Sequence, residues 1–194
     1  APMPALDGVK VLDLTQYEAG TSSTQYLAWF GADVYKVERP GVGDPGRHVS
    51  GSGKDSFYFL SFNNNKKSVA VALDTPQGRD LFLKLVPKVD VVVENFTLGT
   101  MEKLGIGYDV LKEVNPAIIY ASASGYGTKG PHRTWPAMDI LGQARGGTMM
   151  TQGPPDLAPI FSFGGMADQV GAISLSYGIL LALWERARTG EGQQ

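Results

Sequence analysis

Short runs rich in valine and isoleucine recur along this chain, and helix-like segments separate them. The runs fall at residues 8–14, 33–38, 68–74, 90–96 and 117–127. Continuous apolar runs, as opposed to alternating polar and apolar residues, are typical of strands that are buried between two layers of helices. The sequence therefore predicts an α/β fold, with a doubly wound, mostly parallel sheet and helices on both of its faces.

Two of the connecting segments carry helix signals. Residues 20–31 follow the first expected strand and end at Gly31, and a glycine commonly ends a helix. In residues 75–88 the order Thr75–Pro76 suits an N-cap followed by the first helical position. We expect helices over both ranges.

The longest helix is expected over residues 167–188, about 33 Å long at 1.5 Å per residue. Small residues fill its first half and bulky apolar residues fill its second half. Small side chains allow another helix or a ligand to approach closely. A long surface loop is expected over residues 41–56, which are rich in glycine, serine and charged residues.

The composition excludes several kinds of site. The chain has no cysteine, which rules out a thiol nucleophile, disulfides and cysteine-bound metal, and its two histidines are far apart, so we expect no metal site. A net charge of −2 argues against a nucleic-acid binder. No signal-peptide pattern opens the chain, and its longest apolar run, residues 179–184, is too short to span a membrane. We expect a cytoplasmic protein without a membrane segment.

The usual nucleotide-binding motifs are missing. The loop at residues 15–23 lacks the G-x-G-x-x-G pattern of a Rossmann dinucleotide site, and no Walker A sequence occurs. Basic residues nevertheless recur where expected strands meet loops: Arg39, Arg47, Lys66, Lys67 and Lys103. They suit a ligand with several phosphates, since ligands of open α/β sheets bind at strand ends. The alternative is a solvated rim of the sheet.

Asp168 is a lone carboxylate among small residues, ahead of the long apolar helix. It has two interpretations: it caps the helix N-terminus, or it is a nucleophile toward an acyl group. The helix dipole is expected to keep its pKa low, so that the side chain is ionised at neutral pH. Gly164, Gly165 and Gly171 would leave room for a substrate.

Taken together, five segments resemble the family III CoA-transferases, whose superfamily also contains α-methylacyl-CoA racemases. They are residues 6–15, 31–47, 63–73, 90–127 and 182–193. Members are about twice as long as this chain and form interlocked homodimers. The resemblance thus implies that residues 1–194 are the N-terminal portion of a large, Rossmann-like CoA-binding α/β domain. The small domain and the C-terminal return segment would then be absent from this chain.

The resemblance also implies roles for single residues. Asp168 matches the catalytic aspartate, and Arg39, Asn95 and Lys103 match positions that hold the nucleotide and phosphates of CoA. Tyr17 and Ala19 match the loop beside the thioester, and Asp139 matches an acidic position near the active site. The residues expected to bind CoA or substrate are Tyr17, Glu18, Ala19, Arg39, Lys66, Asn95, Phe96, Lys103 and Asp139.

Two departures from the family pattern bear on substrate and reaction. Glu18 stands where formyl-CoA transferases have glutamine, which argues against formyl-CoA or oxalate. Met138 stands where the racemases have a histidine, and a thioether cannot move a proton at neutral pH. This favours a transferase over a racemase or epimerase.

The implied reaction moves CoA from an acyl-CoA to a carboxylic acid through an aspartyl anhydride and an aspartyl-CoA thioester. It needs no metal and no redox cofactor, because the CoA thioester is itself a cosubstrate. Two alternatives stay open: an α-methylacyl-CoA racemase or epimerase, and a non-catalytic half-chain that binds CoA or a partner. The acyl donor and the carboxylate acceptor are not readable from the sequence.

Overall fold

The computed structural model describes residues 3–49 and 55–194. These residues form a five-stranded sheet, in which every pair of neighbouring strands is parallel and the order is β3-β2-β1-β4-β5. The strands are β1 (Lys10–Asp13), β2 (Asp33–Glu38), β3 (Lys66–Ala70), β4 (Val91–Glu94) and β5 (Ile119–Ser122). The order reverses direction at β1, so the doubly wound prediction is confirmed.

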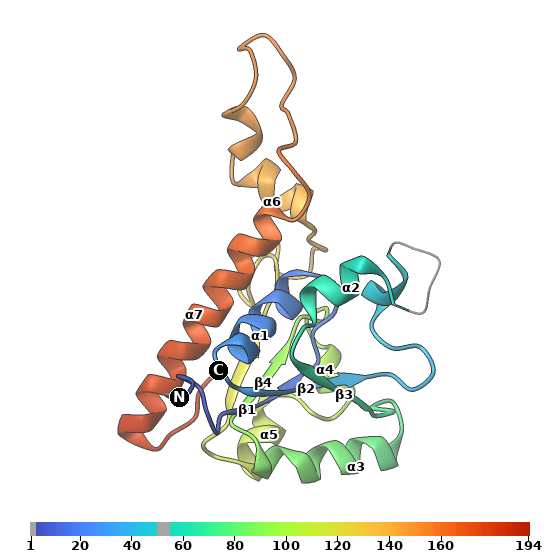
Figure 1. The fold of residues 1–194 in the computed structure, drawn as a ribbon, viewed down its shortest axis with the longest axis vertical. Helices are drawn as coiled ribbons and strands as arrows, with labels where there is room; N and C mark the ends of the chain where they lie inside the picture. The colour runs from blue at the N-terminus through green and yellow to red at the C-terminus, as the bar shows by residue number, and fades with distance from the viewer. Residues whose placement is uncertain (1–2, 50–54) are drawn as a thin grey trace.

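The helices in the described part of the chain lie between these strands or follow β5 (Figure 1). They are α1 (Ala19–Trp29), α2 (Phe57–Phe62), α3 (Pro76–Leu85), α4 (Thr100–Lys103), α5 (Tyr108–Val114), α6 (Asp139–Arg145) and α7 (Met166–Thr189). Short 3₁₀ turns lie at η1 (Pro45–His48), η2 (Val86–Lys88) and η3 (Thr148–Met150).

The signals at the start of α3 are confirmed. The Thr75 side chain accepts a hydrogen bond from the Gly78 N–H at 3.0 Å, and Pro76 takes the first helical position. The strand predicted at 68–74 is shifted, because β3 begins at Lys66 and ends at Ala70. The loop predicted at 41–56 contains η1 and the Ser56 N-cap of α2, and residues 50–54 lie outside the described residues.

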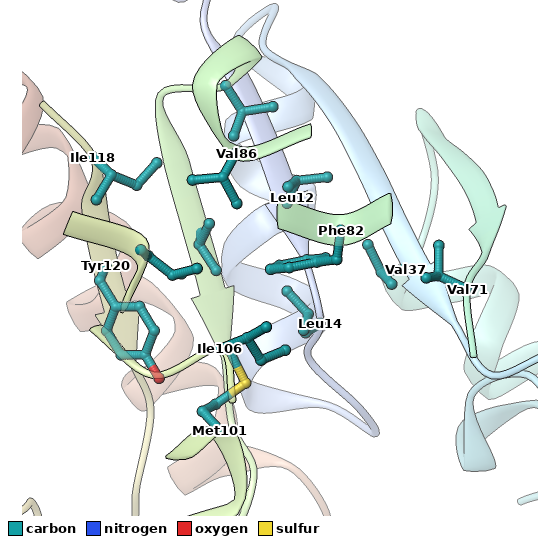
Figure 2. Close-up of a cluster of buried hydrophobic side chains, with 13 residues drawn as sticks. Leu12, Leu14, Val37, Val71, Phe82, Val86, Met101, Ile106, Ile118 and Tyr120 are labelled. Atoms are coloured by element: carbon teal, nitrogen blue, oxygen red, sulfur yellow. The ribbon is translucent and has the colours of Figure 1, made fainter. Parts of the chain in front are cut away.

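The sheet is covered on both faces, each with its own buried cluster. One cluster packs β1, β2, β4 and β5 against α3, α4 and α5, and Phe82 lies at its centre with no exposed surface (Figure 2). The other packs the opposite face against α1 and α7, through residues such as Leu27 and Ile179. Burial of apolar surface on both faces explains why the inner strands read as continuous apolar runs.

Between β5 and α7 the chain leaves the sheet and projects away from it (Figure 1). This projecting segment carries α6, which packs against the first turns of α7. By length and composition α7 is apolar enough to cross a membrane. One side of it packs on the molecule through Ala172, Ser176 and Ile179, while large apolar side chains such as Tyr177 and Trp184 are exposed. The fold thereby brings the start of α7 next to the loop that follows β1.

Candidate functional site

Side chains from two other loops hold the loop between β1 and α1 in place. The Asn95 amide accepts from the Gln16 N–H at 2.7 Å and donates to the Gln16 carbonyl at 2.8 Å. Asp44 accepts from the Tyr17 N–H at 3.3 Å. Tyr17 adopts φ 62°, a left-handed conformation that is uncommon outside glycine, and its side chain is exposed. This loop leads directly into Glu18 and Ala19 at the start of α1.

Asp168 lies in the first turn of α7, but it is not the N-cap. That position belongs to Gly165, with φ 87° and no side-chain cap, so the capping interpretation of Asp168 is wrong. Glu18 explains the glycine: a Cβ at residue 165 would lie 2.1 Å from the Glu18 Oε1. The Glu18 carboxylate therefore occupies the space at the head of α7 where a side chain would otherwise project.

Asp139 supplies the cap that α7 lacks. Its Oδ1 accepts from the Ala167 N–H at 2.6 Å and from the Asp168 N–H at 3.3 Å. Two carboxylates from distant elements, Glu18 and Asp139, thus meet the N-terminal end of the helix that carries Asp168. Negative groups are favourable there, because the first N–H groups of a helix have no partner within it.

The surroundings of Asp168 disfavour its charged form. Burial raises its pKa to about 6, and the negative charges of Glu18 and Asp139 add to the shift. The expected low pKa is therefore wrong, since these effects outweigh the helix dipole. At pH 7 about nine in ten Asp168 side chains are still ionised. Among residues 3–49 and 55–194, the Asp168 carboxylate accepts no hydrogen bond.

Sequence reasoning missed the polar residues that surround Glu18. The Gln169 amide donates to Glu18 at 2.9 Å and to Ser22 at 3.0 Å, and it accepts from the Tyr26 hydroxyl at 2.6 Å. Burial, with Glu18 and Asp168 nearby, raises the pKa of Tyr58 on α2. One signal was available for Gln169: it is a polar residue in the first turn of an otherwise apolar helix.

Lys66 lies away from these carboxylates, in a buried polar network. Its Nζ donates to Asp13 at 2.9 Å, to the Thr21 carbonyl at 2.8 Å and to Asn63 at 2.9 Å. The three hydrogens of the ammonium group are thus matched by three acceptors of the fold. We therefore leave Lys66 out of the phosphate-binding set, although it was expected there.

The other residues expected to bind CoA follow the carboxyl ends of the strands. Arg39 comes directly after β2 and Asn95 directly after β4, and parallel strands place these positions at one edge of the sheet. Arg39 is exposed and pairs with Asp74 at 3.2 Å. Lys103 is an exposed residue at the end of α4, and Phe96 packs against the cluster of Figure 2.

An open groove of about 630 Å³ lies elsewhere, between β5 and α7. Its lining includes Tyr120, Ser124 and Leu175, and it includes none of the residues expected at the site. Within the described ranges, no group of three histidine, cysteine, aspartate or glutamate residues could hold a metal ion.

Known proteins resemble this chain over its whole length. A model of the family described as CoA-transferase family III matches residues 6–194. An acyl-CoA transferase of Fusarium pseudograminearum is 46% identical over 98% of this chain and 44% of its own length. A formyl-CoA:oxalate CoA-transferase of Streptomyces coelicolor is 39% identical over 98% of this chain and 46% of its own. This chain therefore spans less than half the length of these relatives.

Solved structures of similar proteins have the same fold as this chain. A CAIB/BAIF family protein from Brucella suis aligns with a TM-score of 0.94 and 38% identity, over 99% of this chain and 52% of that one. Rv3272 from M. tuberculosis aligns with a TM-score of 0.91 and 38% identity, over 100% of this chain and 54% of that one. The similarity therefore covers all the helices and strands of this chain, in the same order, and is not limited to the sheet.

Proposed function

The chain belongs to CoA-transferase family III, and on that premise we propose that the full-length protein moves CoA from an acyl-CoA to a carboxylic acid, with Asp168 as the nucleophile. The observation that carries the proposal is the Asp168 carboxylate, which lies half-buried in the first turn of α7 and has no hydrogen-bond donor in the described part of the chain. Relatives named as acyl-CoA and formyl-CoA:oxalate transferases support the reaction class.

We further propose that this chain is the N-terminal part of a longer polypeptide, the first part of its large CoA-binding α/β domain. Support comes from the relatives, of whose length the chain covers 44–46%. The small domain and the return segment would then lie outside it. We also propose that the full-length protein forms an interlocked homodimer in the cytoplasm. Its substrates are an acyl-CoA and a carboxylic acid.

The first half of the reaction makes Asp168 an acyl acceptor. A carboxylate oxygen of Asp168 attacks the thioester carbonyl, the C–S bond breaks, and CoA leaves as its thiolate. The product is a mixed anhydride between the acyl group and Asp168. The thiolate then attacks the aspartyl carbonyl of the anhydride, which releases the donor acid and leaves an aspartyl-CoA thioester.

The second half repeats these steps with the acceptor acid. Its carboxylate attacks the aspartyl carbonyl and displaces the thiolate, which forms a second anhydride. The thiolate attacks the acceptor's carbonyl, so that Asp168 leaves as a carboxylate and the new acyl-CoA forms. No proton is needed at the α-carbon, so the reaction has no use for the histidine that racemases have. Met138, which replaces it, is 72% exposed at the N-cap of α6.

Asp168→Asn in the full-length protein tests the nucleophile. We expect CoA transfer to fall by at least about a thousandfold, because an amide does not form the anhydride. The matched control is Asp109→Asn, the same change in the first turn of α5, and it should transfer CoA at the wild-type rate. Hydroxylamine added with donor acyl-CoA should convert Asp168 to a hydroxamate that mass spectrometry locates. Near-wild-type transfer by Asp168→Asn, or a label on Glu18 or Asp139, would contradict the mechanism.

Arg39→Ala and Lys103→Ala test the CoA site. Each change removes an exposed cation from the predicted phosphate side, so the Kd for CoA should rise about tenfold by calorimetry. Lys88→Ala removes an exposed lysine from η2 and serves as the control. Unchanged affinity in both variants would remove these residues from the site.

The wild-type protein tests the non-catalytic alternative. If it binds CoA but transfers CoA between no pair of acyl donor and carboxylate acceptor, the chain is part of a CoA-binding protein without transferase activity.

A further inference from the structure

Both oxygens of Asp139 are occupied within the protein. Oδ1 accepts the two N–H groups of Ala167 and Asp168, and Oδ2 accepts the Gln143 side-chain amide at 2.8 Å. The carboxylate thus links α6 to the first turn of α7. A side chain engaged in this way has little capacity left for a substrate, although its position lies beside the proposed nucleophile.

Gln143 extends this link to the segment that enters α7. It is a buried residue, 1% exposed. Its amide donates to the Phe163 carbonyl at 2.9 Å as well as to Asp139, and its Oε1 accepts from the Ser162 N–H at 3.1 Å. Each end of the amide is therefore paired, which fixes its orientation. Gln143 therefore holds Asp139 in place and also fixes the backbone at Ser162 and Phe163, just before Gly165.

The contact between the two helices is also close. A Cβ added at Gly142 would lie 2.7 Å from the Ala167 Cβ, so α6 reaches α7 only because residue 142 has no side chain. Since Gly165 offers no side-chain cap, the orientation of the first turn of α7 depends on what α6 supplies. An Asn or Ser could cap these N–H groups as a neutral side chain. The residue present is instead a carboxylate.

We propose that Asp139 is a positioning residue, which fixes the first turn of α7 and thereby aims the Asp168 carboxylate. The proposal rests on Asp168 being the nucleophile. The groups that face Asp168 are Glu18 from the start of α1, Tyr58 from α2 and Asp139 from α6. A charged neighbour that raises a pKa makes the ionised form more nucleophilic, at the cost of a smaller ionised fraction in acid.

Asp139→Asn in the full-length protein separates positioning from substrate binding. The Asn side chain keeps one oxygen for the N–H groups, but its amide meets the Gln143 amide donor to donor, and the negative charge is gone. We expect kcat to fall about tenfold or more, because a small misplacement of a reacting group is costly. The KM for acyl-CoA should stay within about twofold. The acid limb of the rate profile should move to lower pH by about half a unit or more.

Gly142→Ala provides a second variant that keeps every charge. Alanine favours the helix, so α6 should form, but its Cβ must push α6 away from Ala167. We expect kcat to fall severalfold with an unchanged KM. Gly146→Ala, in the residue after α6, is the control: its Cβ meets only the carbonyl of Gly142 at 3.0 Å, within the same segment.

The outcomes distinguish this inference from the proposed function. If Asp168→Asn is inactive but Asp139→Asn keeps the wild-type kcat and pH profile, Asp139 does not position the nucleophile. A raised KM with an unchanged kcat in Asp139→Asn would make it a substrate contact and would also overturn the inference. If Asp139→Asn does not fold, Gly142→Ala decides: a lower kcat supports the inference, and a wild-type kcat overturns it. An active Asp168→Asn would instead refute the proposed function.

Discussion

Two groups of charged side chains contact the loop between β1 and α1 or its neighbouring residues, and their charges are arranged in opposite ways. In the first, which we call the paired network, Lys36 lies 2.7 Å from Asp44 and Lys66 lies 2.9 Å from Asp13. In the second, the acidic cluster of Glu18, Asp139 and Asp168, none of the carboxylates has an ion pair within the described residues. The paired network is buried and its charges are matched by opposite charges, whereas the acidic cluster is partly buried and its charges are unmatched.

The pKa values follow this difference. Burial alone would raise the pKa of Asp13, but Lys66 and Lys36 outweigh it and hold the value at about 2. At Asp168 burial and two like charges act in the same direction and raise the pKa to about 6. A buried charge with partners holds elements of a fold together, whereas one kept without partners is costly and is typical of a reactive group.

Lys66→Met tests the paired network and should have the largest effect on stability. The change keeps the length of the side chain but leaves Asp13 buried with one cation fewer. Removing one member of a buried ion pair commonly costs about 3–5 kcal/mol, because the remaining charge stays desolvated. Urea unfolding of the full-length protein measures the loss.

The adjacent lysine supplies the control. Lys67 pairs with Asp33 at 2.6 Å, but both side chains are largely exposed, so Lys67→Met should leave the urea midpoint unchanged. A Lys66→Met protein of normal stability with weakened CoA binding would contradict the comparison, and it would return Lys66 to the CoA site. Equal losses in both variants would mean that burial does not separate the two pairs.

The sheet was predictable because its inner strands are buried on both faces. Val91, Val92 and Val93 of β4 have no exposed surface, and a run of such residues has few other uses. The edge strand β3 was placed too late for the same reason. It begins with Lys66 and Lys67, and charged residues do not fit the pattern of a buried strand. The apolar Val71, which does fit that pattern, follows the last residue of β3.

The site was predictable only in part. Asp168 stands out because small residues surround it in the sequence. Its neighbours do not, since Glu18 and Asp139 reach it from elements about 150 and about 29 residues away along the chain. The true N-cap, Gly165, makes sense only once Glu18 is known to fill the space beside it. The contacts of Lys66 could not be predicted, because a lysine near a strand looks the same in a sequence whether its side chain reaches solvent or a buried carboxylate.

Asp168→Asn should have a smaller effect of the opposite sign: it should make the protein more stable at alkaline pH. An ordinary Asp has a pKa of 3.8, and in the fold Asp168 has one of about 6. The folded state therefore binds the proton more tightly than the unfolded state does. Below pH 3.8 both states are protonated and the fold carries no penalty. As pH rises through about 6 the folded carboxylate ionises beside Glu18 and Asp139, and stability is lost.

The Asn variant does not ionise and should avoid this loss. We expect it to be more stable than the wild type by about 1 kcal/mol at pH 8, a value reduced for the partial exposure of the side chain. The difference should shrink to nothing near pH 4, and urea unfolding at the two pH values measures it. Lys66→Met and Asp168→Asn would then shift stability in opposite directions. The first change leaves the buried Asp13 with one cation fewer, and the second removes an unpaired negative charge. An Asn variant that is less stable at pH 8 would show that ionised Asp168 has a partner in the full-length protein, and the acidic cluster would then be as well paired as the network around Lys66.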